Sequence, residues 1–156
     1  ISKPFANLTV LQTVRIGALN RVGEMEAATA RAEAILDRVG LARKRGELGR
    51  HLTVVERKRL ELARALATQP SLLLLDEVAA GLTPAEVQEM IVLIRGIAAE
   101  GVAVLTIEHV LEAVMRVSGR IIVLNYGQVI AEGRPGDLVN DPRVIEAYLG
   151  EAYQLA

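Results

Sequence analysis

The chain has 156 residues, a net charge of −1 and no cysteine, and 51% of its residues are apolar. This composition is sufficient for one hydrophobic core, and the absence of cysteine excludes disulfides and thiolate metal sites. The balanced charge and the low aromatic content of 3% argue against a nucleic-acid-binding protein. No apolar run reaches the roughly 18 residues that span a bilayer, so we expect a soluble, cytosolic protein.

The first 69 residues predict helices. An amphipathic segment at 8–20 and an Ala- and Glu-rich segment at 24–39, which ends at Gly40, predict the first two. A basic, glycine-containing stretch, ARKRGELGRH, then leads into a third helix over about residues 54–68.

Residues 70–133 instead predict alternating strands and helices. Apolar runs at 71–76 and 102–107 predict buried strands, and a helix at 84–100 between them makes a βαβ unit with a parallel sheet. A short helix at 109–117 follows, and then a hairpin of strands 121–125 and 128–132 around a Tyr-Gly turn. The stretch DPRVIEAYLG near the end predicts a short helix that packs on the body.

The helix at 84–100 carries its own start signal. Thr83 is suited to cap it, Pro84 fits its first turn, and Glu86 stands where a capping box needs it. Helical spacing predicts one apolar face, formed by Val87, Met90, Ile91, Ile94 and Ala98.

Charged side chains follow both predicted parallel strands. Asp76 and Glu77 end the first, and Glu108 and His109 follow the second, at the sheet edge where ligands bind in open α/β folds. A carboxylate there can hold Mg²⁺ through a water, its neighbour can activate an attacking water, and a histidine can donate to a phosphate. The alternative is that the acidic pair begins a polar loop and His109 begins a helix.

The segment LTVVERKRLELARAL, residues 52–66, has two interpretations. Thr53 and Glu56 form a capping box for the helix that follows. The same helix N-terminus, with a hydroxyl at its cap, can also bind a phosphate through free N–H groups. Local physics does not separate the two.

Four stretches together resemble the ATPase subunits of ATP-binding-cassette (ABC) transporters. Asp76–Glu77 after the leucine run resembles their Walker B segment, AAGLTP their D-loop, and Ile107-Glu108-His109 their switch histidine. LTVVERKRLELARAL stands where the signature motif, usually written LSGGQ, belongs. The opening PFANLTVLQTV and the closing DPRVIEAYLG most resemble the branched-chain amino-acid uptake type.

The resemblance implies a fold and an assembly. It implies an α/β chain with part of a P-loop-type parallel sheet and crossover helices: a helical subdomain at 1–69, ending in the signature helix, and the C-terminal part of the ATPase core with a tail helix at 70–156. Residues 1–50 would dock on a membrane permease. Two ATPase subunits would form a head-to-tail dimer, with the 80–83 loop crossing the interface, peripheral to the cytoplasmic face of the membrane.

The resemblance also implies residue roles in an importer for branched-chain amino acids, with amides or urea as rival solutes. Asp76 would contact Mg²⁺, Glu77 would be the general base for water attack on ATP, and His109 would polarise the γ-phosphate. The signature stretch would touch the nucleotide of the other subunit through Leu52, Thr53, Val54, Val55 and Glu56.

Two features depart from the family pattern. No G-x-x-x-x-G-K-[ST] phosphate loop occurs, and none of the three lysines follows a glycine. We therefore expect a chain that begins past the glutamine of the Q-loop, binds ATP and Mg²⁺ weakly or not at all, and is inactive alone. Val55 stands where the signature motif has glycine, and a β-branched side chain there hinders close approach to a phosphate.

Without the rest of the nucleotide-binding core, apolar surface and strand edges should be bare, and self-association is expected. Two other functions remain as alternatives. One is a non-hydrolysing module for permease docking and dimerisation. The other is an unrelated small-molecule α/β hydrolase, although the chain lacks a G-x-S-x-G nucleophile elbow.

Overall fold

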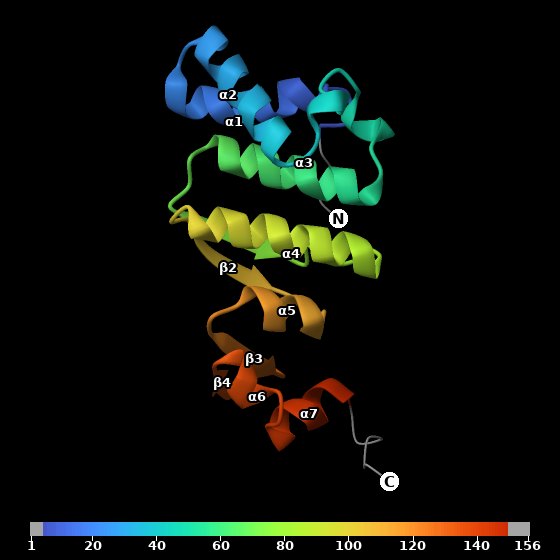
Figure 1. Ribbon diagram of the computed structural model, residues 1–156, viewed down its shortest axis with the longest axis vertical. Helices are drawn as coiled ribbons and strands as arrows, with labels where there is room; N and C mark the ends of the chain where they lie inside the picture. The colour runs from blue at the N-terminus through green and yellow to red at the C-terminus, as the bar shows by residue number, and fades with distance from the viewer. Residues whose placement is uncertain (1–4, 150–156) are drawn as a thin grey trace. The chain divides into compact units, whose positions relative to one another are not determined.

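The computed structural model describes residues 5–149, and the chain falls into two units that divide between Ile107 and Glu108. The first unit contains the long helices and a parallel pair of strands, and the second contains an antiparallel pair of strands with short helices (Figure 1). The predicted domain boundary at 69/70 lies inside the first unit, and as a functional division it stays a prediction.

The first unit begins with three helices, α1 (Val10–Val22), α2 (Met25–Arg38) and α3 (Val54–Ala67). Two short 3-10 helices, η1 (Ala42–Lys44) and η2 (Gly49–His51), lie between α2 and α3. Capping boxes at Thr9 and Thr53 set where α1 and α3 begin, because each threonine and the side chain three residues later satisfy each other's backbone N–H groups. The three predicted helices are confirmed within about two residues at each end.

Small residues let these helices approach closely. A Cβ atom at Gly17 of α1 would lie 2.6 Å from the backbone oxygen of Arg64 and 3.1 Å from the Cβ of Ala67, both on α3. Arg31 and Arg21 donate to the carbonyls of Ala67 and Thr68 at the C-terminal end of α3, at 3.2 and 2.6 Å. These cations satisfy carbonyl groups that have no partner within the helix.

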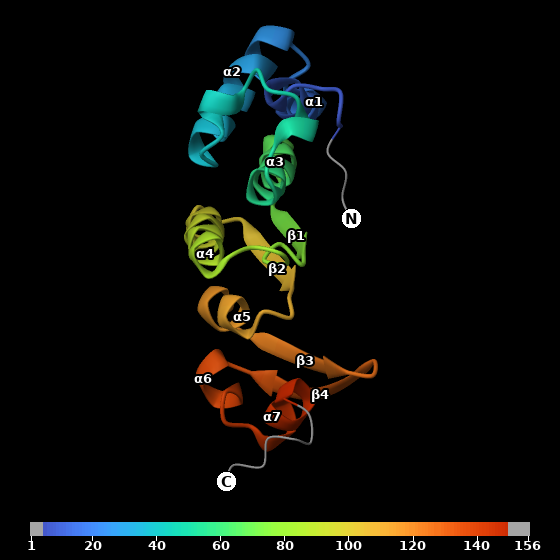
Figure 2. The same cartoon turned by 90° about the vertical axis from the view of Figure 1, so that its right-hand side faces the viewer.

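The strands β1 (Leu72–Asp76) and β2 (Ala103–Ile107) pair in parallel, with Leu72 opposite Ala103 and Asp76 opposite Ile107. The crossover helix α4 (Pro84–Ala99) lies along one face of this pair (Figure 2). It begins at the predicted Thr83 capping box. The βαβ unit is therefore confirmed, and the chain is an α/β protein as predicted.

The prediction that both strands are buried is wrong. Leu73 and Leu75 are 3% and 7% exposed, but the other face of the pair is open: Leu72, Leu74, Leu105 and Ile107 are 53–65% exposed. Continuous apolar runs are typical of parallel strands that are covered on both faces. The described residues cover only one face, so alternate residues of each run remain in contact with solvent.

The second unit contains α5 (Leu111–Val117), the hairpin β3 (Ile121–Asn125) and β4 (Gln128–Gly133), and two short helices, α6 (Pro135–Leu138) and α7 (Pro142–Leu149). The hairpin turn is Tyr126–Gly127, and both residues have positive φ, 47° and 78°, as a two-residue primed turn requires. The core of the second unit consists of Ile121, Val123, Ala131, Leu138 and Val144. Val144 belongs to α7, so the tail helix packs on the hairpin as predicted; residue 150 of that stretch lies outside the described residues.

Within residues 5–149, no helix is both long enough and apolar enough to cross a membrane. This agrees with the sequence, in which the apolar runs have the length of strands.

Candidate functional site

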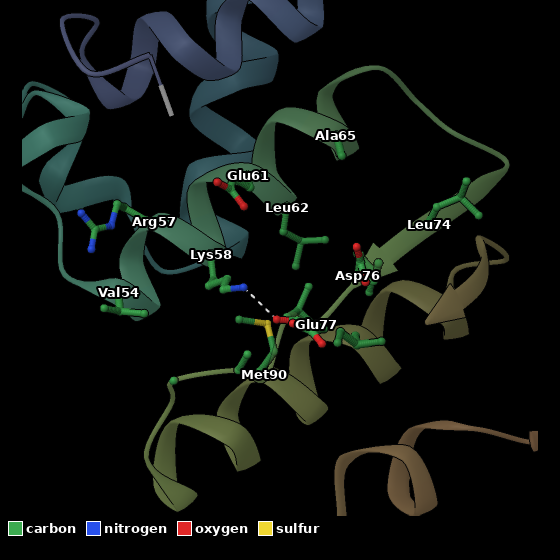
Figure 3. A pocket seen from close by; sticks show the side chains of 15 residues that line it. Val54, Arg57, Lys58, Glu61, Leu62, Ala65, Leu74, Asp76, Glu77 and Met90 are labelled. Carbon is green, nitrogen blue, oxygen red and sulfur yellow. Dashed lines mark hydrogen bonds between the residues drawn. The ribbon is translucent and has the colours of Figure 1, made fainter. Parts of the chain in front are cut away.

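A cavity of about 870 Å³ lies in the first unit, between α3, the end of β1, the loop that follows it and α4 (Figure 3). Its walls combine apolar side chains with charged ones. The charged lining residues are Arg57, Lys58, Glu61, Asp76 and Glu77. The two carboxylates that the sequence singled out therefore line one cavity.

Strand β1 ends at Asp76, and the backbone makes a sharp turn at Glu77. Successive side chains of an extended strand point to opposite faces, so two adjacent residues do not normally line one cavity. Asp76 is the last residue of β1, and Glu77 has a φ of +48°, in the left-handed region that residues with a side chain rarely adopt. This turn redirects the chain at Glu77.

Hydrogen bonds fix the peptide groups on both sides of this turn. The Glu77 N–H donates to the carbonyl of Ile107 on β2 at 2.9 Å, and the Glu77 carbonyl accepts from the N–H of Ala80 at 3.2 Å. The same carbonyl accepts from Lys58 Nζ on α3 at 2.7 Å. Sequence reasoning missed Lys58, because the two residues are 19 positions apart and no local pattern pairs a helix lysine with a strand-end carbonyl.

The predicted signature residues lie at and just before the start of α3. Val54 is 44% exposed and lines the cavity. Leu52 is buried, Thr53 is exposed and Val55 is half-buried; these three and Glu56 lie outside the lining of the cavity. The structure thus brings Val54 together with Asp76 and Glu77.

The carboxylate of Glu56 is already engaged. It accepts from the Thr53 N–H at 2.9 Å and pairs with the ammonium of Lys44 at 3.1 Å. Partial burial favours a higher pKa for Glu56, but the hydrogen bonds from Thr53 and Lys44 outweigh it and hold the pKa below its usual value. Glu56 in turn raises the pKa of Lys44. A negative charge therefore sits on the N-terminal turn of α3, where the motif LSGGQ has an uncharged glutamine.

That charge weakens the phosphate interpretation of the helix start. A helix N-terminus attracts anions through its free N–H groups and its partial positive charge. Here Thr53 and Glu56 occupy N–H groups of the first turn, and the carboxylate offsets the positive end. The capping interpretation is confirmed, and the phosphate interpretation stays a prediction.

His109 belongs to the second unit, where it is exposed and lies two residues before α5 begins. Asp76 and Glu77 belong to the first unit. The role predicted for His109 beside the acidic pair therefore stays a prediction.

The acidic pair fits only part of a Mg²⁺ site. No group of three or more metal-ligating side chains occurs in the described part of the chain. Mg²⁺ is usually held by one or two carboxylates together with water and substrate phosphates, rather than by an all-protein cage. The exposed carboxylate of Asp76 at the cavity can supply one such oxygen. It fits an ion that arrives with a phosphate ligand.

Comparisons with known proteins all give ATP-binding proteins of transport systems or their families. Residues 2–80 match the model of a family described as ABC transporter, and residues 128–154 match one described as branched-chain amino acid ATP-binding cassette transporter. The high-affinity branched-chain amino acid transport ATP-binding protein LivG of Escherichia coli is 43% identical over 126 residues, which are 80% of this chain and 49% of LivG. The lipopolysaccharide export system ATP-binding protein LptB of Acidithiobacillus ferridurans is 36% identical over 148 residues, 95% of this chain and 58% of LptB.

A solved structure agrees. The ADP conformation of MJ1267, an ATP-binding cassette of an ABC transporter, matches with a TM-score of 0.82 at 27% identity, over 97% of this chain and 66% of that one. The predicted fold class is confirmed by this likeness. The chain spans about half the length of LivG, as the coverage of 49% shows.

Proposed function

The chain belongs to the ABC transporter family, and we propose that it contributes the acidic half of an active site to an ATP-hydrolysing subunit that energises an importer. One observation carries the proposal: Asp76 and Glu77 stand at the carboxyl end of a parallel strand and line one cavity with α3. In open α/β sheets this is where ligands bind.

The proposed roles follow from the placement of each group. Glu77, exposed at the cavity, acts as general base for the attacking water, and Asp76 supplies one oxygen to Mg²⁺. MgATP supplies the phosphates and the metal charge that this chemistry needs. His109 contacts the γ-phosphate, and the start of α3 contacts nucleotide held by a second subunit; the family resemblance supports these two roles.

Branched-chain amino acids are the proposed solute class. The match of residues 128–154 and the name of LivG support this choice. The chain is also similar to LptB, whose name refers to lipopolysaccharide, so the solute class is supported less strongly than membership of the family. The proposed partners are membrane permease subunits, which the helices of residues 1–50 contact, and a second ATPase subunit. A peripheral position at the cytoplasmic face of the membrane follows from those partners.

A chimera tests the proposal. The chain's residues replace the matching 126 residues of E. coli LivG, and ATP hydrolysis is measured with Glu77→Gln and with Glu61→Gln as a control on the same cavity. A general base contributes about 10²- to 10⁴-fold, so Glu77→Gln should lower kcat by that factor while Glu61→Gln stays within about twofold. A folded chimera that keeps its rate with Glu77→Gln would refute the assignment.

The start of α3 is tested in the same chimera. Val55→Gly removes a β-branched side chain from the candidate signature stretch, and we expect a higher ATPase rate because a backbone without a Cβ lets a phosphate approach closely. Equal rates for the chimera and its Val55→Gly variant would remove the steric argument.

A second function is a non-hydrolysing module that docks on the permease and dimerises. The absence of a phosphate-loop sequence and the engaged Glu56 carboxylate favour it for this chain alone. Calorimetry of the chain with ATP, with and without Mg²⁺, tests this alternative: micromolar affinity would show that the chain binds nucleotide without a phosphate loop and would count against a module that only docks and dimerises. The unrelated-hydrolase alternative is set aside because the family match covers the acidic pair.

A further inference from the structure

Lys58 reaches from α3 to the strand end that carries the acidic pair. It stands five residues after the Thr53 cap, and its ammonium donates to the carbonyl of Glu77 at 2.7 Å (Figure 3). The side chain is half-buried along the cavity wall. Lysines on a helix surface usually extend their charge into water, so a short bond to one particular carbonyl requires an explanation.

The explanation lies in the conformation of Glu77. A residue with a Cβ atom persists at a φ of +48° only where the surrounding structure holds it there. The Glu77 N–H is held by Ile107 of β2, and its carbonyl is held by Lys58 and by the Ala80 N–H. Of these three contacts, the one from Lys58 is the only one made by a side chain, and it comes from α3, 19 residues earlier in the chain.

We propose that Lys58 is a positioning residue that locks the left-handed turn at Glu77 and thereby aims the Glu77 carboxylate into the cavity. The inference rests on the proposed function only in naming Glu77 as the general base. Lys58 itself touches a backbone oxygen and no reacting atom.

The bond also ties two parts of the site together. The candidate signature residues begin α3, a little over one turn before Lys58. A shift of α3 along β1 would change the distance between Lys58 Nζ and the Glu77 carbonyl. The bond therefore couples the position of α3 to the backbone conformation of Glu77.

Amide hydrogen exchange of this chain tests the lock without nucleotide. In Lys58→Met the Glu77 and Ala80 amides should exchange about tenfold faster, the change that loss of about one net hydrogen bond gives. Lys58→Arg, which keeps a donor, should retain most of the protection. Arg57→Met is the matched control, because Arg57 neighbours Lys58 and lines the same cavity but turns away from Glu77 (Figure 3); it should change these rates less than twofold.

A glycine background gives a second readout. Glycine adopts a positive φ without strain, so in Glu77→Gly the further change Lys58→Met should alter the exchange of Ala80 less than threefold. A role of Lys58 in general stability would persist in that background. If Lys58→Met prevents folding, Lys58→Ala, which also lacks a donor and suits a helix, carries the same comparison.

Three results would overturn the inference: equal exchange in Lys58→Met and Arg57→Met, a uniform rise across β1 and α4, or an undiminished effect in Glu77→Gly. None of them bears on hydrolysis. A chimera that folds but does not hydrolyse ATP would overturn the proposed function and leave the lock in place. An active chimera in which Lys58→Met does not change the exchange at Glu77 would overturn the lock and leave the proposed function in place.

Discussion

Gly17 offers a sharp test of how α3 is seated. Two glycines, Gly17 of α1 and Gly96 of α4, occupy helix interiors, where alanine is favoured over glycine by about 1 kcal/mol. They differ in surroundings. A Cβ atom at Gly96 would meet nothing within 4 Å, whereas one at Gly17 would meet the backbone oxygen of Arg64 at 2.6 Å and the Cβ of Ala67 at 3.1 Å. Only alanine at Gly17 would force two helices, α1 and α3, apart.

The magnitudes follow from this difference. Overpacking typically costs about 1–3 kcal/mol, so Gly17→Ala should lower the free energy of unfolding by about 1 kcal/mol after the gain in helix propensity. Gly96→Ala should raise it by about 1 kcal/mol, and the two variants should differ by about 2 kcal/mol. Urea unfolding followed by far-UV circular dichroism measures both. If Gly17→Ala stabilises the chain as much as Gly96→Ala, α1 and α3 do not approach as closely as described.

Three further predictions concern the strand end, the start of α4 and the open sheet face. Glu77→Gly should raise the free energy of unfolding by about 0.5–1 kcal/mol by removing strain at a positive φ, as urea unfolding would show, and a loss of stability would contradict this. Hydrogen bonds from Thr83 hold the pKa of Glu86 below its usual 4.5. The stability that the ionised Glu86 gives to the folded chain is therefore present above pH 4.5 and is lost as the pH falls through the lowered pKa. The gap in unfolding midpoint between the wild-type chain and Thr83→Ala should therefore narrow between about pH 6 and about pH 3, and a constant gap would refute it. Light scattering should show self-association at tens of micromolar that Leu74→Lys reduces, whereas a clean wild-type monomer would contradict it.

The boundaries of the elements could be predicted because local chemistry sets them. Thr53 and Thr83 begin their helices through capping boxes, Gly40 follows α2 with a φ of +76°, and Tyr126–Gly127 makes the hairpin turn. Each signal involves neighbours in sequence. The inner face of α4 was predicted nearly as well, except that Ile97 is buried there and Ala98 is exposed.

The features that were missed depend on distant parts of the chain. The leucine run shows that both faces of β1 are apolar, but it contains no information on what covers them, and Leu74 proved 65% exposed. The pairing of Lys58 with Glu77 depends on how α3 lies against β1. The left-handed turn at Glu77 was missed for the same reason, since glutamate has no local preference for a positive φ.

The charges of the cavity explain why the acidic pair is incomplete by itself. Two cations, Arg57 and Lys58, line it together with three carboxylates, those of Glu61, Asp76 and Glu77. Lys58 is committed to a backbone carbonyl, and the start of α3 carries its own carboxylate. A triphosphate alone therefore meets repulsion here, and its charge must be balanced by Mg²⁺ and by cations beyond those that line the cavity. The excess of carboxylates over cations in the cavity thus predicts that ATP binding depends on Mg²⁺, because the ion offsets the repulsion between these carboxylates and the phosphates.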